Sequence, residues 1–394
     1  MSTANPLAEK QAVERNREVE KQRAGSHASF AGIAMVFQGI LIVAHVFVYE
    51  TWKAMWGGAG ARASAGMAAA AALLCFFFLA ATILAFRYNN APLRVFYRVA
   101  AVWLGALNFL VLASAASWLA YGFIAASGIA LPGRWIVGSF FGAAALVSVW
   151  AVANANWVRV KKVRIRLANL PEAWRGRTAV LVSDLHLGHV HHHGFASRIV
   201  RKIGALQPDV IFLAGDMFDG TQVNAPELMA PFRFLRPPQG IFFATGNHEL
   251  FRGDAYFSDS IRAAGIRVLE NEKVLLNGLQ VLGVPYIHAT HAEHFRSVLA
   301  KLAIDPSRAS ILLTHAPDRP AITAEAGIGL QLSGHTHRGQ FFPFSWITRR
   351  IYGAFTYGLA RLGETQFYTS SGAGTWGPPL RLGSQAEIVQ ITFE

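Results

Sequence analysis

Four short strings of acidic, amide and imidazole residues lie in the last two-thirds of the chain, and each follows a strand-like apolar run. Open α/β sheets gather their ligands in the crevice outside the carboxyl ends of the strands, so these side chains are expected to meet in space. Together they offer enough ligands for two metal ions, which indicates a hydrolase. The strings are Asp184-Leu185-His186, Gly215-Asp216-Met217-Phe218-Asp219, Gly246-Asn247-His248-Glu249 and Gly334-His335-Thr336-His337, and His315 ends a fifth apolar run.

This ligand set suits the hydrolysis of phosphate esters. At neutral pH that reaction needs a nucleophile and neutralisation of charge, and two cations about 3.5–4 Å apart supply both through a bridging hydroxide and a clamp on the phosphoryl oxygens. Carboxylate and imidazole ligands favour manganese, iron or zinc over magnesium or copper(I). We therefore expect two divalent metal ions per subunit as cofactors.

The segment from about Arg177 to Gly374 resembles the calcineurin-like metallophosphoesterase superfamily, because every motif of that family's pattern has a matching residue here. The resemblance implies an α/β fold in four layers, α/β/β/α, with two mixed sheets between outer helices. It also implies how the ligands divide between the metals. Asp184, His186 and His337 would hold the first ion, Asn247, His315 and His335 would hold the second, and Asp216 would bridge them.

Two residues outside the ligand set have roles implied by the same resemblance. His248 would stay off the metals and protonate the leaving-group oxygen, a contribution of typically about 10²–10⁴-fold. Asp219 would orient His248. The alternative for Asp219 is a turn residue after the strand, since Asp219-Gly220 is itself a turn signal.

The last part of the segment is similar to a membrane-associated bacterial phosphodiesterase branch of the superfamily. The similarity rests on the strings Gly334–Pro343, Tyr368–Gly374 and Pro379–Arg381. Those relatives usually carry glycine at the position of Arg338, so the pocket here has another shape or Arg338 binds a second phosphate of the substrate. The aromatic and basic insertion Phe341–Leu362 is either a flap of the core or an interfacial element that meets lipid.

Apolar runs in the same segment predict the strands that position these residues. Most of the runs are separated by stretches of helical length, an alternation typical of an α/β fold. The expected helices are Phe195–Ala205, Ala255–Ala264 and Glu293–Leu302. The expected strands are Thr178–Ser183, Asp209–Ala214, Gly240–Thr245, Gln280–Val284, Ser310–Thr314, Leu330–Ser333, Gln366–Ser370 and Glu387–Phe393, and the period-two run Val160–Leu167 adds an entry strand.

The first 154 residues have the composition of a membrane region. Hydrophobic residues make up 53% of the chain and its mean hydropathy is +0.31, which is too apolar for one soluble globule of this size. The excess lies in four runs of about 20 residues, the length that crosses a hydrocarbon core. The runs are Phe30–Tyr49, Ser64–Phe86, Val99–Tyr121 and Trp135–Ala153.

These features divide the chain into four parts: a charged tail over residues 1–26, a bundle of four transmembrane helices over 27–154, a basic linker with the entry strand over 155–176, and the metallophosphoesterase domain over 177–394. Thirteen Lys and Arg flank the runs on the side of the termini, and three flank them on the other side. The positive-inside rule then places both termini and the catalytic domain in the cytoplasm. We expect a multi-pass protein of the bacterial inner membrane.

The net charge of +13 is expected to face the lipid bilayer. The charge divides into +6 before residue 155 and +7 from there on, and much of the second part lies in Arg159–Arg166, which follows the last run. Anionic headgroups attract such juxtamembrane segments. No nucleic-acid partner is expected, because the chain has no basic stripe interleaved with stacking aromatics. The single cysteine, Cys75, excludes a disulfide within the chain.

Three further patterns leave alternatives open. The small residues Gly138 and Gly142 let two helices approach closely, either inside the bundle or at the seam of a homodimer. Gln38, His45 and Asn108 are polar groups at membrane depth, which either form hydrogen bonds between helices or serve a transport path or a bound haem. The last pattern is a loop that is solvated, holds a third metal or contacts the substrate, and its histidines are His189, His191, His192 and His193.

The favoured function is a membrane-anchored dinuclear-metal phosphohydrolase that cleaves a phosphodiester or pyrophosphate bond, with a lipid-linked or headgroup-bearing substrate. A tethered catalytic domain gains effective concentration for substrates in the same bilayer. The alternatives are a phosphodiesterase for soluble nucleotides, a phosphomonoesterase, and a membrane sensor or transport component whose metal domain is regulatory. The complete ligand set favours an enzyme.

Overall fold

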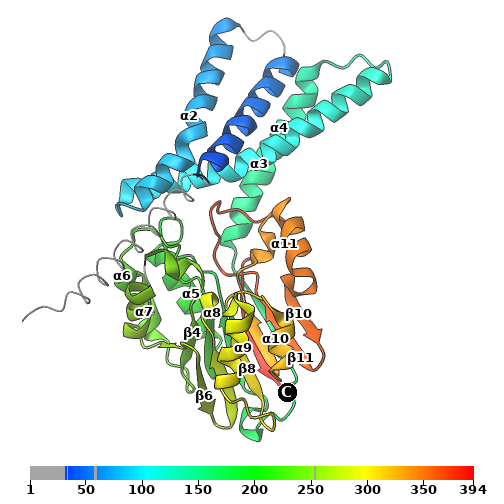
Figure 1. Ribbon diagram of the computed structural model, residues 1–394. Coiled ribbons are helices and arrows are strands. Elements are labelled where there is room, and N and C mark those ends of the chain that lie inside the picture. Colours follow the sequence, from blue (N-terminus) through cyan, green and yellow to red (C-terminus); the bar gives the residue numbers. More distant parts are fainter. Residues whose placement is uncertain (1–31, 33, 57–59, 253) are drawn as a thin grey trace, which may run out of the picture. The chain divides into compact units, whose positions relative to one another are not determined.

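The computed structural model describes residues 32, 34–56, 60–252 and 254–394 (Figure 1). The expected tail over residues 1–26 and the start of the first apolar run lie outside this part of the chain. After a first helix, Ala34–Trp56, the α-helices are α2 (Ala61–Ala85), α3 (Ala91–Ala126), α4 (Gly133–Asn156), α5 (His193–Ala205), α6 (Ala225–Met229), α7 (Asp254–Ala263), α8 (Tyr286–Ala289), α9 (Ala292–Lys301), α10 (Pro320–Glu325) and α11 (Phe344–Tyr352).

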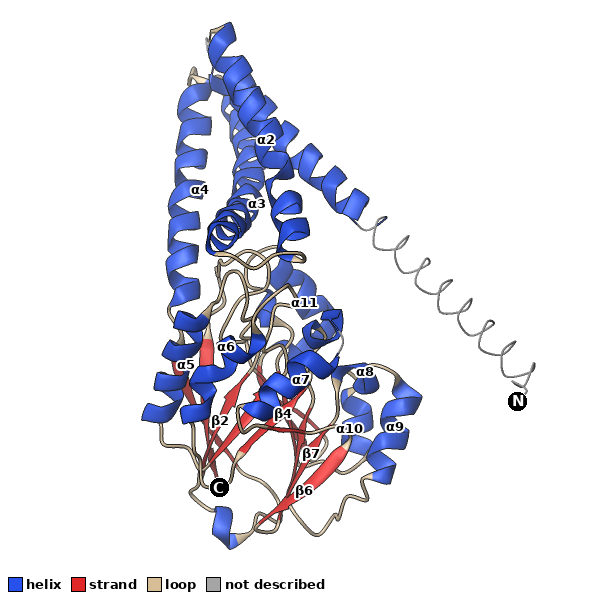
Figure 2. Cartoon of the chain, turned by 90° about the vertical axis from the view of Figure 1, so that its left-hand side faces the viewer, coloured by secondary structure: helices blue, strands red, loops and turns tan. Residues whose placement is uncertain are grey.

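The strands belong to two six-stranded sheets (Figure 2). The first sheet has the order β1-β12-β2-β3-β4-β5 and the second β10-β11-β9-β8-β7-β6. Both sheets are mixed, because parallel neighbours such as β2 and β3 lie beside antiparallel pairs such as β12 and β2. The strands are β1 (Arg159–Ile165), β2 (Thr178–Val182), β3 (Val210–Ala214), β4 (Ile241–Ala244), β5 (Arg267–Val268), β6 (Glu272–Leu276), β7 (Leu279–Gly283), β8 (Ser310–Leu313), β9 (Leu330–Ser333), β10 (Gly358–Leu362), β11 (Thr365–Thr369) and β12 (Glu387–Phe393).

Three apolar layers hold this α/β domain together. Helices α5 and α7 pack on one face of the first sheet, with Phe195 and Phe257 in that layer. The two sheets face each other across a second layer, which includes Phe212 and Ile311. Helices α9 and α10 cover the outer face of the second sheet, where Phe295 is buried. The four-layer α/β/β/α sandwich is therefore confirmed.

The central strands are buried on both faces. In β3, all five residues are buried, and they alternate between the helix-facing layer and the layer between the sheets. Strands with two buried faces read as continuous apolar runs, and for this reason the sequence predicts them well. The sequence does not predict β5, which has two residues, or β6 and β10, which lie at sheet edges and are only partly buried.

Four helices are long and apolar enough to cross a membrane: Ala34–Trp56, α2, α3 and α4. Each coincides with one of the predicted runs. Only 11% of the most apolar window of α2 and 39% of that of α3 is buried within the protein. Most of their apolar side chains therefore need an apolar environment outside the protein, which a bilayer supplies. These helices mark the chain as a membrane protein.

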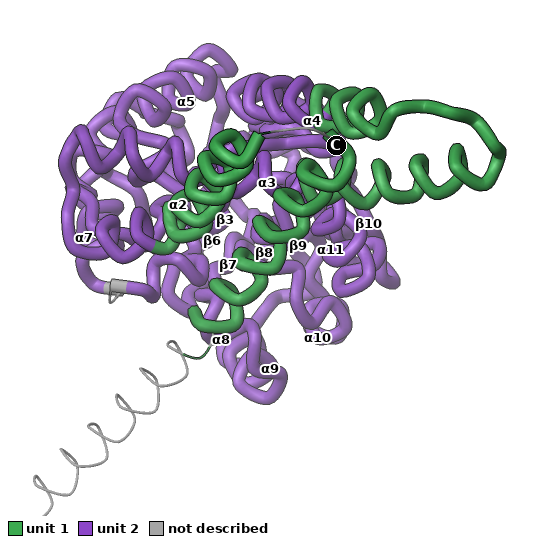
Figure 3. Tube along the Cα trace, turned by 90° about the horizontal axis from the view of Figure 1, so that it is seen from above, with its two compact units in different colours: residues 1–79, 110–143 green, residues 80–109, 144–394 purple. Residues whose placement is uncertain are grey.

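Contacts between residues divide the chain into two compact units (Figure 3). One contains the residues up to Leu79 and Leu110–Ala143, and the other contains Ala80–Phe109 and Ala144–Glu394. The sequence places the end of the membrane region at residue 154, whereas the second unit joins the α/β domain to the end of α2, the first half of α3 and the last turns of α4. These helix segments are part of the body that carries the α/β domain.

Within the first unit, Gln38 Nε2 donates a hydrogen bond to the carbonyl of Cys75 at 3.2 Å, as expected for a polar group that packs between helices. A Cβ atom at Gly138 would contact Trp56 at 3.7 Å, and one at Gly142 would meet nothing within 4 Å among the described residues. Internal packing in this unit therefore does not use both glycines, and the homodimer seam stays a prediction.

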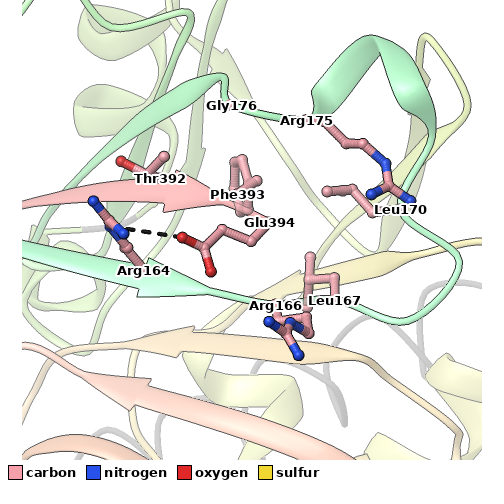
Figure 4. Close-up of a pocket in the computed structure, with 9 residues that line it drawn as sticks. All are labelled: Arg164, Arg166, Leu167, Leu170, Arg175, Gly176, Thr392, Phe393 and Glu394. Atoms are coloured by element: carbon pink, nitrogen blue, oxygen red, sulfur yellow. Dashed lines mark ion pairs between the residues drawn. The ribbon is translucent and has the colours of Figure 1, made fainter.

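Strand β1 follows the end of α4 and pairs in parallel with β12. At about 3.3 Å per residue, the strand carries the chain roughly 20 Å along the sheet edge. It ends at a pocket of about 640 Å³, where Arg164 lies 3.6 Å from Glu394 and Arg166 is a neighbour (Figure 4). Residues Arg159–Ile165 pair with β12 along their whole length, and the expected contact of this basic segment with lipid stays a prediction.

Candidate metal centre

The predicted ligands all lie just beyond the carboxyl ends of strands, and both sheets contribute. This is the edge at which open α/β sheets place their ligands. Asp184 and His186 follow β2, Asp216 follows β3, Asn247 follows β4, His315 follows β8, and His335 and His337 follow β9.

Two pairs of imidazole rings define two centres within this site. Nε2 of His186 lies 3.0 Å from Nε2 of His337, and Nδ1 of His335 lies 3.2 Å from Nε2 of His315. Nitrogen atoms that converge in this way can ligate a shared cation. A carboxylate completes each pair with ligand atoms within 4.8 Å of one another, and the resulting groups are Asp184, His186 and His337, and Asp216, His315 and His335.

Asp216 lies between the two centres. Its Oδ2 atom is 3.1 Å from Nε2 of His315 in one centre and 3.8 Å from Nε2 of His186 in the other. A carboxylate has two oxygens, which can share their charge between two cations. This position agrees with the bridging role that the family resemblance implies.

Two buried polar atoms of the site, Oδ1 of Asn247 and Nδ1 of His186, have no hydrogen-bond partner among the described residues. Leaving a buried acceptor unpaired costs about 1–3 kcal/mol, so Oδ1 of Asn247 calls for a ligand. His315 is also oriented to bind a cation. Its Nδ1 donates to the carbonyl of Ala214 at 2.8 Å, so its Nε2 faces the site. The donor set therefore fits two divalent cations.

The backbone at the site is strained. Asp184, His186 and Asp216 have φ values of 53°, 46° and 53°, and His335 and His337 have values of 71° and 49°. Residues other than glycine rarely adopt this left-handed region, and each such position costs of order 1–3 kcal/mol. Such residues cluster where function requires a fixed geometry, which supports the assignment of these five as ligands.

Two glycines give the carboxylates room. A Cβ atom at Gly334 would lie 2.3 Å from Oδ2 of Asp184, and one at Gly246 would lie 2.1 Å from Oδ1 of Asp216. Real Cβ atoms do not approach oxygen so closely. Any other residue at either position would therefore displace a predicted ligand.

Burial and charge set the protonation of the ligands. Burial lowers the pKa of His186 and His337 well below the usual range and that of His335 to about 3, so these rings are neutral and keep a lone pair for a cation. Burial also opposes the charge of His315, but the Asp216 carboxylate outweighs it and raises the pKa of His315 to about 10. Burial raises the pKa of Asp216, yet the charge of His315 holds it well below its usual range.

Glu249 is a buried residue to which sequence reasoning assigned no role. Its carboxylate accepts hydrogen bonds from the main-chain amides of Asp216 at 3.1 Å, Phe218 at 3.2 Å and Gly246 at 2.7 Å. Burial and the nearby Asp216 carboxylate raise the pKa of Glu249 to about 7. Glu249 thus ties together the loops that follow β3 and β4, and its position directly after His248 was the available signal.

Arg381 is a second residue that sequence reasoning missed, although its string was noted. Its guanidinium is fully buried and donates to the carbonyls of Ser371 and Gly374, each at 2.7 Å. It also approaches the carbonyl of His337 at 3.4 Å. Burial lowers the pKa of Arg381 to about 10, which leaves it charged. Arg381 therefore holds the loop after β11 against the loop that carries His337.

His248 is held by Asp219, but through the backbone. Nδ1 of His248 donates to the main-chain carbonyl of Asp219 at 2.9 Å, and its Nε2 lies 3.9 Å from Oδ2 of Asp216. The Asp219 carboxylate instead accepts from the amide and hydroxyl of Thr221, at 2.9 and 2.6 Å, and from the amide of His189. The side chain of Asp219 thus stabilises the turn that follows β3, which is the alternative role indicated by the sequence.

Aromatic side chains border His248. The ring centroids of Phe251 and Trp376 lie 4.9 and 6.2 Å from that of His248. Phe251 is 57% exposed and Trp376 is 60% exposed. The predicted leaving-group side of the site therefore opens onto an apolar surface.

Arg338 is exposed, and its guanidinium lies 4.5 Å from the centre of the Tyr357 ring. Its φ of 50° is a value that glycine adopts at no steric cost, which explains why glycine suits this position in the relatives it resembles. The contact of Arg338 with a second phosphate stays a prediction.

The histidine loop does not have the features of a third metal site. His189 is buried and its ring bonds to Thr221 and to the carbonyl of Tyr88, and Nε2 of His191 accepts from the amide of Thr375. Within the described residues, the groups that could hold a metal include neither ring.

Residues 178–339 match the profile of a family described as calcineurin-like phosphoesterase. An uncharacterized metallophosphoesterase of Campylobacter jejuni is 33% identical over 239 residues, 60% of this chain and 63% of that protein. The corresponding match in Bos taurus, named transmembrane protein with metallophosphoesterase domain, is 31% identical over 255 residues, 60% of this chain and 57% of that protein.

The chain thus spans less than two-thirds of these two relatives. A shorter relative, an uncharacterized metallophosphoesterase of Aquifex aeolicus, is 32% identical over 258 residues, which cover 64% of this chain and 97% of that protein. The residues that the structure brings together lie inside the matched segment. The chain belongs to the calcineurin-like phosphoesterase family.

Proposed function

We propose that this protein is a membrane-anchored, metal-dependent phosphohydrolase that cleaves a phosphodiester or pyrophosphate bond of a lipid-linked substrate. The observation that carries the proposal is the position of Asp216 between two pairs of imidazole rings. Two divalent cations held there would neutralise the negative charge of the phosphoryl oxygens and lower the pKa of coordinated water. The ligand types suit manganese, iron or zinc.

His248 is the residue placed to protonate the leaving group. The carbonyl of Asp219 fixes its Nδ1, so Nε2 is the atom that can give a proton to an oxygen in the site. The three amide hydrogen bonds of Glu249 and the buried guanidinium of Arg381 hold the surrounding loops in place. The chain thus supplies a preorganised acid beside the ligand cluster.

Helix α11 supports a lipid-linked substrate. Phe344, Ile347 and Ile351 share one face of the helix, and they are 49%, 39% and 67% exposed. The face packed on the protein carries the small polar residues Ser345 and Thr348 instead. An exposed apolar helix face is unfavourable in water but is stabilised at a membrane interface.

Contacts within the same unit join α11 to a membrane helix. Asn108 of α3 donates from Nδ2 to the carbonyl of Phe342 at 3.0 Å, and the rings of Phe109 and Phe341 lie 5.7 Å apart. Asn108 belongs to the apolar part of α3, which supports a position near the bilayer for the segment that leads into α11. A substrate held in that bilayer could reach the aromatic border of His248 without leaving the lipid.

The sidedness of the enzyme is part of the proposal. The excess of Lys and Arg at the termini, in the connection between α2 and α3 and in the first turns of α3 favours a cytoplasmic catalytic domain in a bacterial inner membrane. The substrate is then a lipid of the inner leaflet or a lipid-linked nucleotide that faces the cytoplasm.

The test uses the full-length chain, loaded with manganese and reconstituted into vesicles. Hydrolysis is measured for bis-para-nitrophenyl phosphate, its monoester, cyclic nucleotides, phospholipids and nucleotide-linked lipids. Asp216→Asn is expected to lose all activity, and Asp259→Asn, which changes an exposed acid on α7, is expected to keep it.

A lipid that outcompetes every soluble ester is the expected result. Preference for cyclic nucleotides or for the monoester would contradict the lipid-linked substrate and favour the alternatives stated for the sequence. Metal-loaded protein that cleaves no ester, with two ions bound per chain, would instead favour a regulatory metal domain.

A further inference from the structure

A basic pocket lies where α3 and α4 meet α5 (Figure 2 labels the three helices). Its volume is about 340 Å³, within the range of small-molecule sites. The lining residues include Arg98 of α3, Asn156 of α4 and Arg198 of α5, all of which belong to the unit that carries the metal centre. None of the predicted metal ligands lines it.

The pocket holds positive charge without a carboxylate. No acidic residue is among the described residues that line it. Within the described part of the chain, the buried Nε of half-buried Arg198 has no hydrogen-bond partner. Arg98 is exposed and donates from Nη2 to the carbonyl of Val190 at 3.0 Å. A buried N–H group of a cation is best satisfied by an anion.

Neighbouring residues reflect this positive field. Burial lowers the pKa of His191, which lines the pocket, to about 3, and the charges of Arg381, Arg98 and Arg198 contribute to the shift. His191 is therefore a neutral member of the wall. The charge available to a ligand comes from Arg98 and Arg198.

The first turn of α5 faces the same space. The helix has 13 residues, begins at His193 and has no side-chain cap, and Gly194 of its first turn lines the pocket. The first amides of a helix have no partner within the helix and lie at the positive end of its dipole, where phosphate groups bind. The two arginines and the start of α5 offer donors from separate elements, which suits the several oxygens of a phosphate group.

The rest of the wall is apolar. Val102 of α3 and Val152 of α4 line the pocket together with Phe195 and Pro379. Val102 and Val152 belong to two helices that are long and apolar enough to cross a membrane, so part of the pocket wall comes from the predicted membrane helices. A ligand that fits both walls has a phosphate group joined to an apolar body.

We propose that this pocket binds the phosphate group of an anionic phospholipid. The lipid would sit between the ends of α3 and α4 with its headgroup phosphate on Arg98, Arg198 and the first turn of α5. Basic pockets between membrane helices at the cytoplasmic side bind lipid headgroups in this manner. The site does not depend on the proposed hydrolysis, since none of its lining residues is a predicted metal ligand.

The test is lipid retention by the full-length protein in detergent, followed by native mass spectrometry. The probes are phosphatidylglycerol, phosphatidylcholine and inorganic phosphate. The wild-type chain is expected to bind one phosphatidylglycerol at least about tenfold more tightly than phosphatidylcholine. Arg198→Gln and Arg98→Gln are each expected to weaken phosphatidylglycerol about tenfold, because each removes a charge-assisted hydrogen bond.

Arg201→Gln is the matched control, because Arg201 lies on α5 but is exposed and does not line the pocket. Unchanged metal content and melting temperature show that the variants are folded. If Arg198→Gln does not fold, the retention of phosphatidylglycerol by Arg98→Gln tests the proposal. Equal retention of the two lipids, or an equal loss in Arg201→Gln, overturns the proposal. Displacement of the lipid by millimolar inorganic phosphate also overturns it, because the site would then bind free phosphate.

Discussion

The side chain of Asn154 in α4 donates a hydrogen bond to the main-chain carbonyl of Arg381 at 2.9 Å, across 227 residues of sequence. The same amide group donates to the carbonyl of Ser384 at 3.0 Å, and the amide of Arg381 donates to the carbonyl of Ala151. The guanidinium of Arg381 in turn contacts the main chain of His337. Arg381 therefore connects the end of a predicted membrane helix with a predicted metal ligand.

Replacing Asn154 is therefore expected to loosen the metal centre. Asn154→Ala leaves two buried carbonyls without their donor, which costs about 1–3 kcal/mol. We expect a lower melting temperature of the full-length protein and weaker binding of Mn²⁺ in a metal titration. Asn156→Ala is the control, because the exposed side chain of Asn156 donates to the carbonyl of Val152 in its own helix at 2.9 Å. An unchanged Mn²⁺ affinity in Asn154→Ala would show that α4 does not position the site.

The ligand set of the site could be predicted from sequence because each ligand lies in a short motif next to a recognisable strand. Each ligand follows a buried strand within a few residues, and strands such as β3 that are buried on both faces produce uninterrupted apolar runs. The four-layer order of the sheets came from the family resemblance, since alternation alone does not specify which strands are neighbours.

The contacts that support the site could not be predicted, because they join distant parts of the chain. Glu249 binds amides more than 30 residues away, and the bond between Asn154 and Arg381 crosses the border expected at residue 154. The outward orientation of the apolar face of α11 could not be predicted either, because aromatic residues among arginines are compatible with a core flap as well as with a membrane interface. The side chain of Asp219 was assigned to His248, whereas a backbone carbonyl makes that contact.

Glu249→Gln is expected to weaken metal binding without touching a ligand. The carboxylate accepts three amide hydrogen bonds. A glutamine would turn an NH₂ group towards at least one of these donors and leave it unpaired at a cost of about 1–3 kcal/mol. The measurements are Mn²⁺ content after dialysis and melting temperature, with the exposed Glu270→Gln as control. Full metal content in Glu249→Gln would contradict the positioning role.

His248→Ala is expected to keep both metals and lose rate. The loss should be about 10²–10⁴-fold for an alkoxide leaving group and much smaller for para-nitrophenolate, since only a poor leaving group needs a proton. Turnover of the two kinds of diester is compared at equal metal content, with His294→Ala, which changes an exposed histidine of α9, as control. Equal losses for both leaving groups would count against the acid role.

The membrane topology can be tested with reporter fusions. Thirteen Lys and Arg flank the spans on the side of the termini and three on the other, so a reporter after Glu394 is expected to be cytoplasmic. A reporter inserted near Gly128, between α3 and α4, should behave as external. Activity of an alkaline phosphatase fused after Glu394 in intact cells would reverse the assigned orientation.

A polar residue on the outward face of α11 is expected to reduce turnover of lipids but not of soluble esters. Ile351 is 67% exposed and shares that face with Phe344 and Ile347. Removing one large apolar side chain from lipid costs about 1.5–3 kcal/mol, so Ile351→Asn should lower turnover of a vesicle-borne lipid by about tenfold or more at subsaturating concentration.

Hydrolysis of bis-para-nitrophenyl phosphate provides the internal reference for that variant, since α11 presents Ile351 away from the ligand cluster and a small soluble diester does not need the membrane contact. Leu275→Asn is the matched control, because Leu275 is 55% exposed on β6, an edge strand of the second sheet. If Ile351→Asn and Leu275→Asn cleave vesicle-borne lipid equally well, α11 does not meet the bilayer. If Ile351→Asn loses both activities together, its effect is on the folding of the loop that carries His337, and the outward face of α11 has no separate role in substrate access.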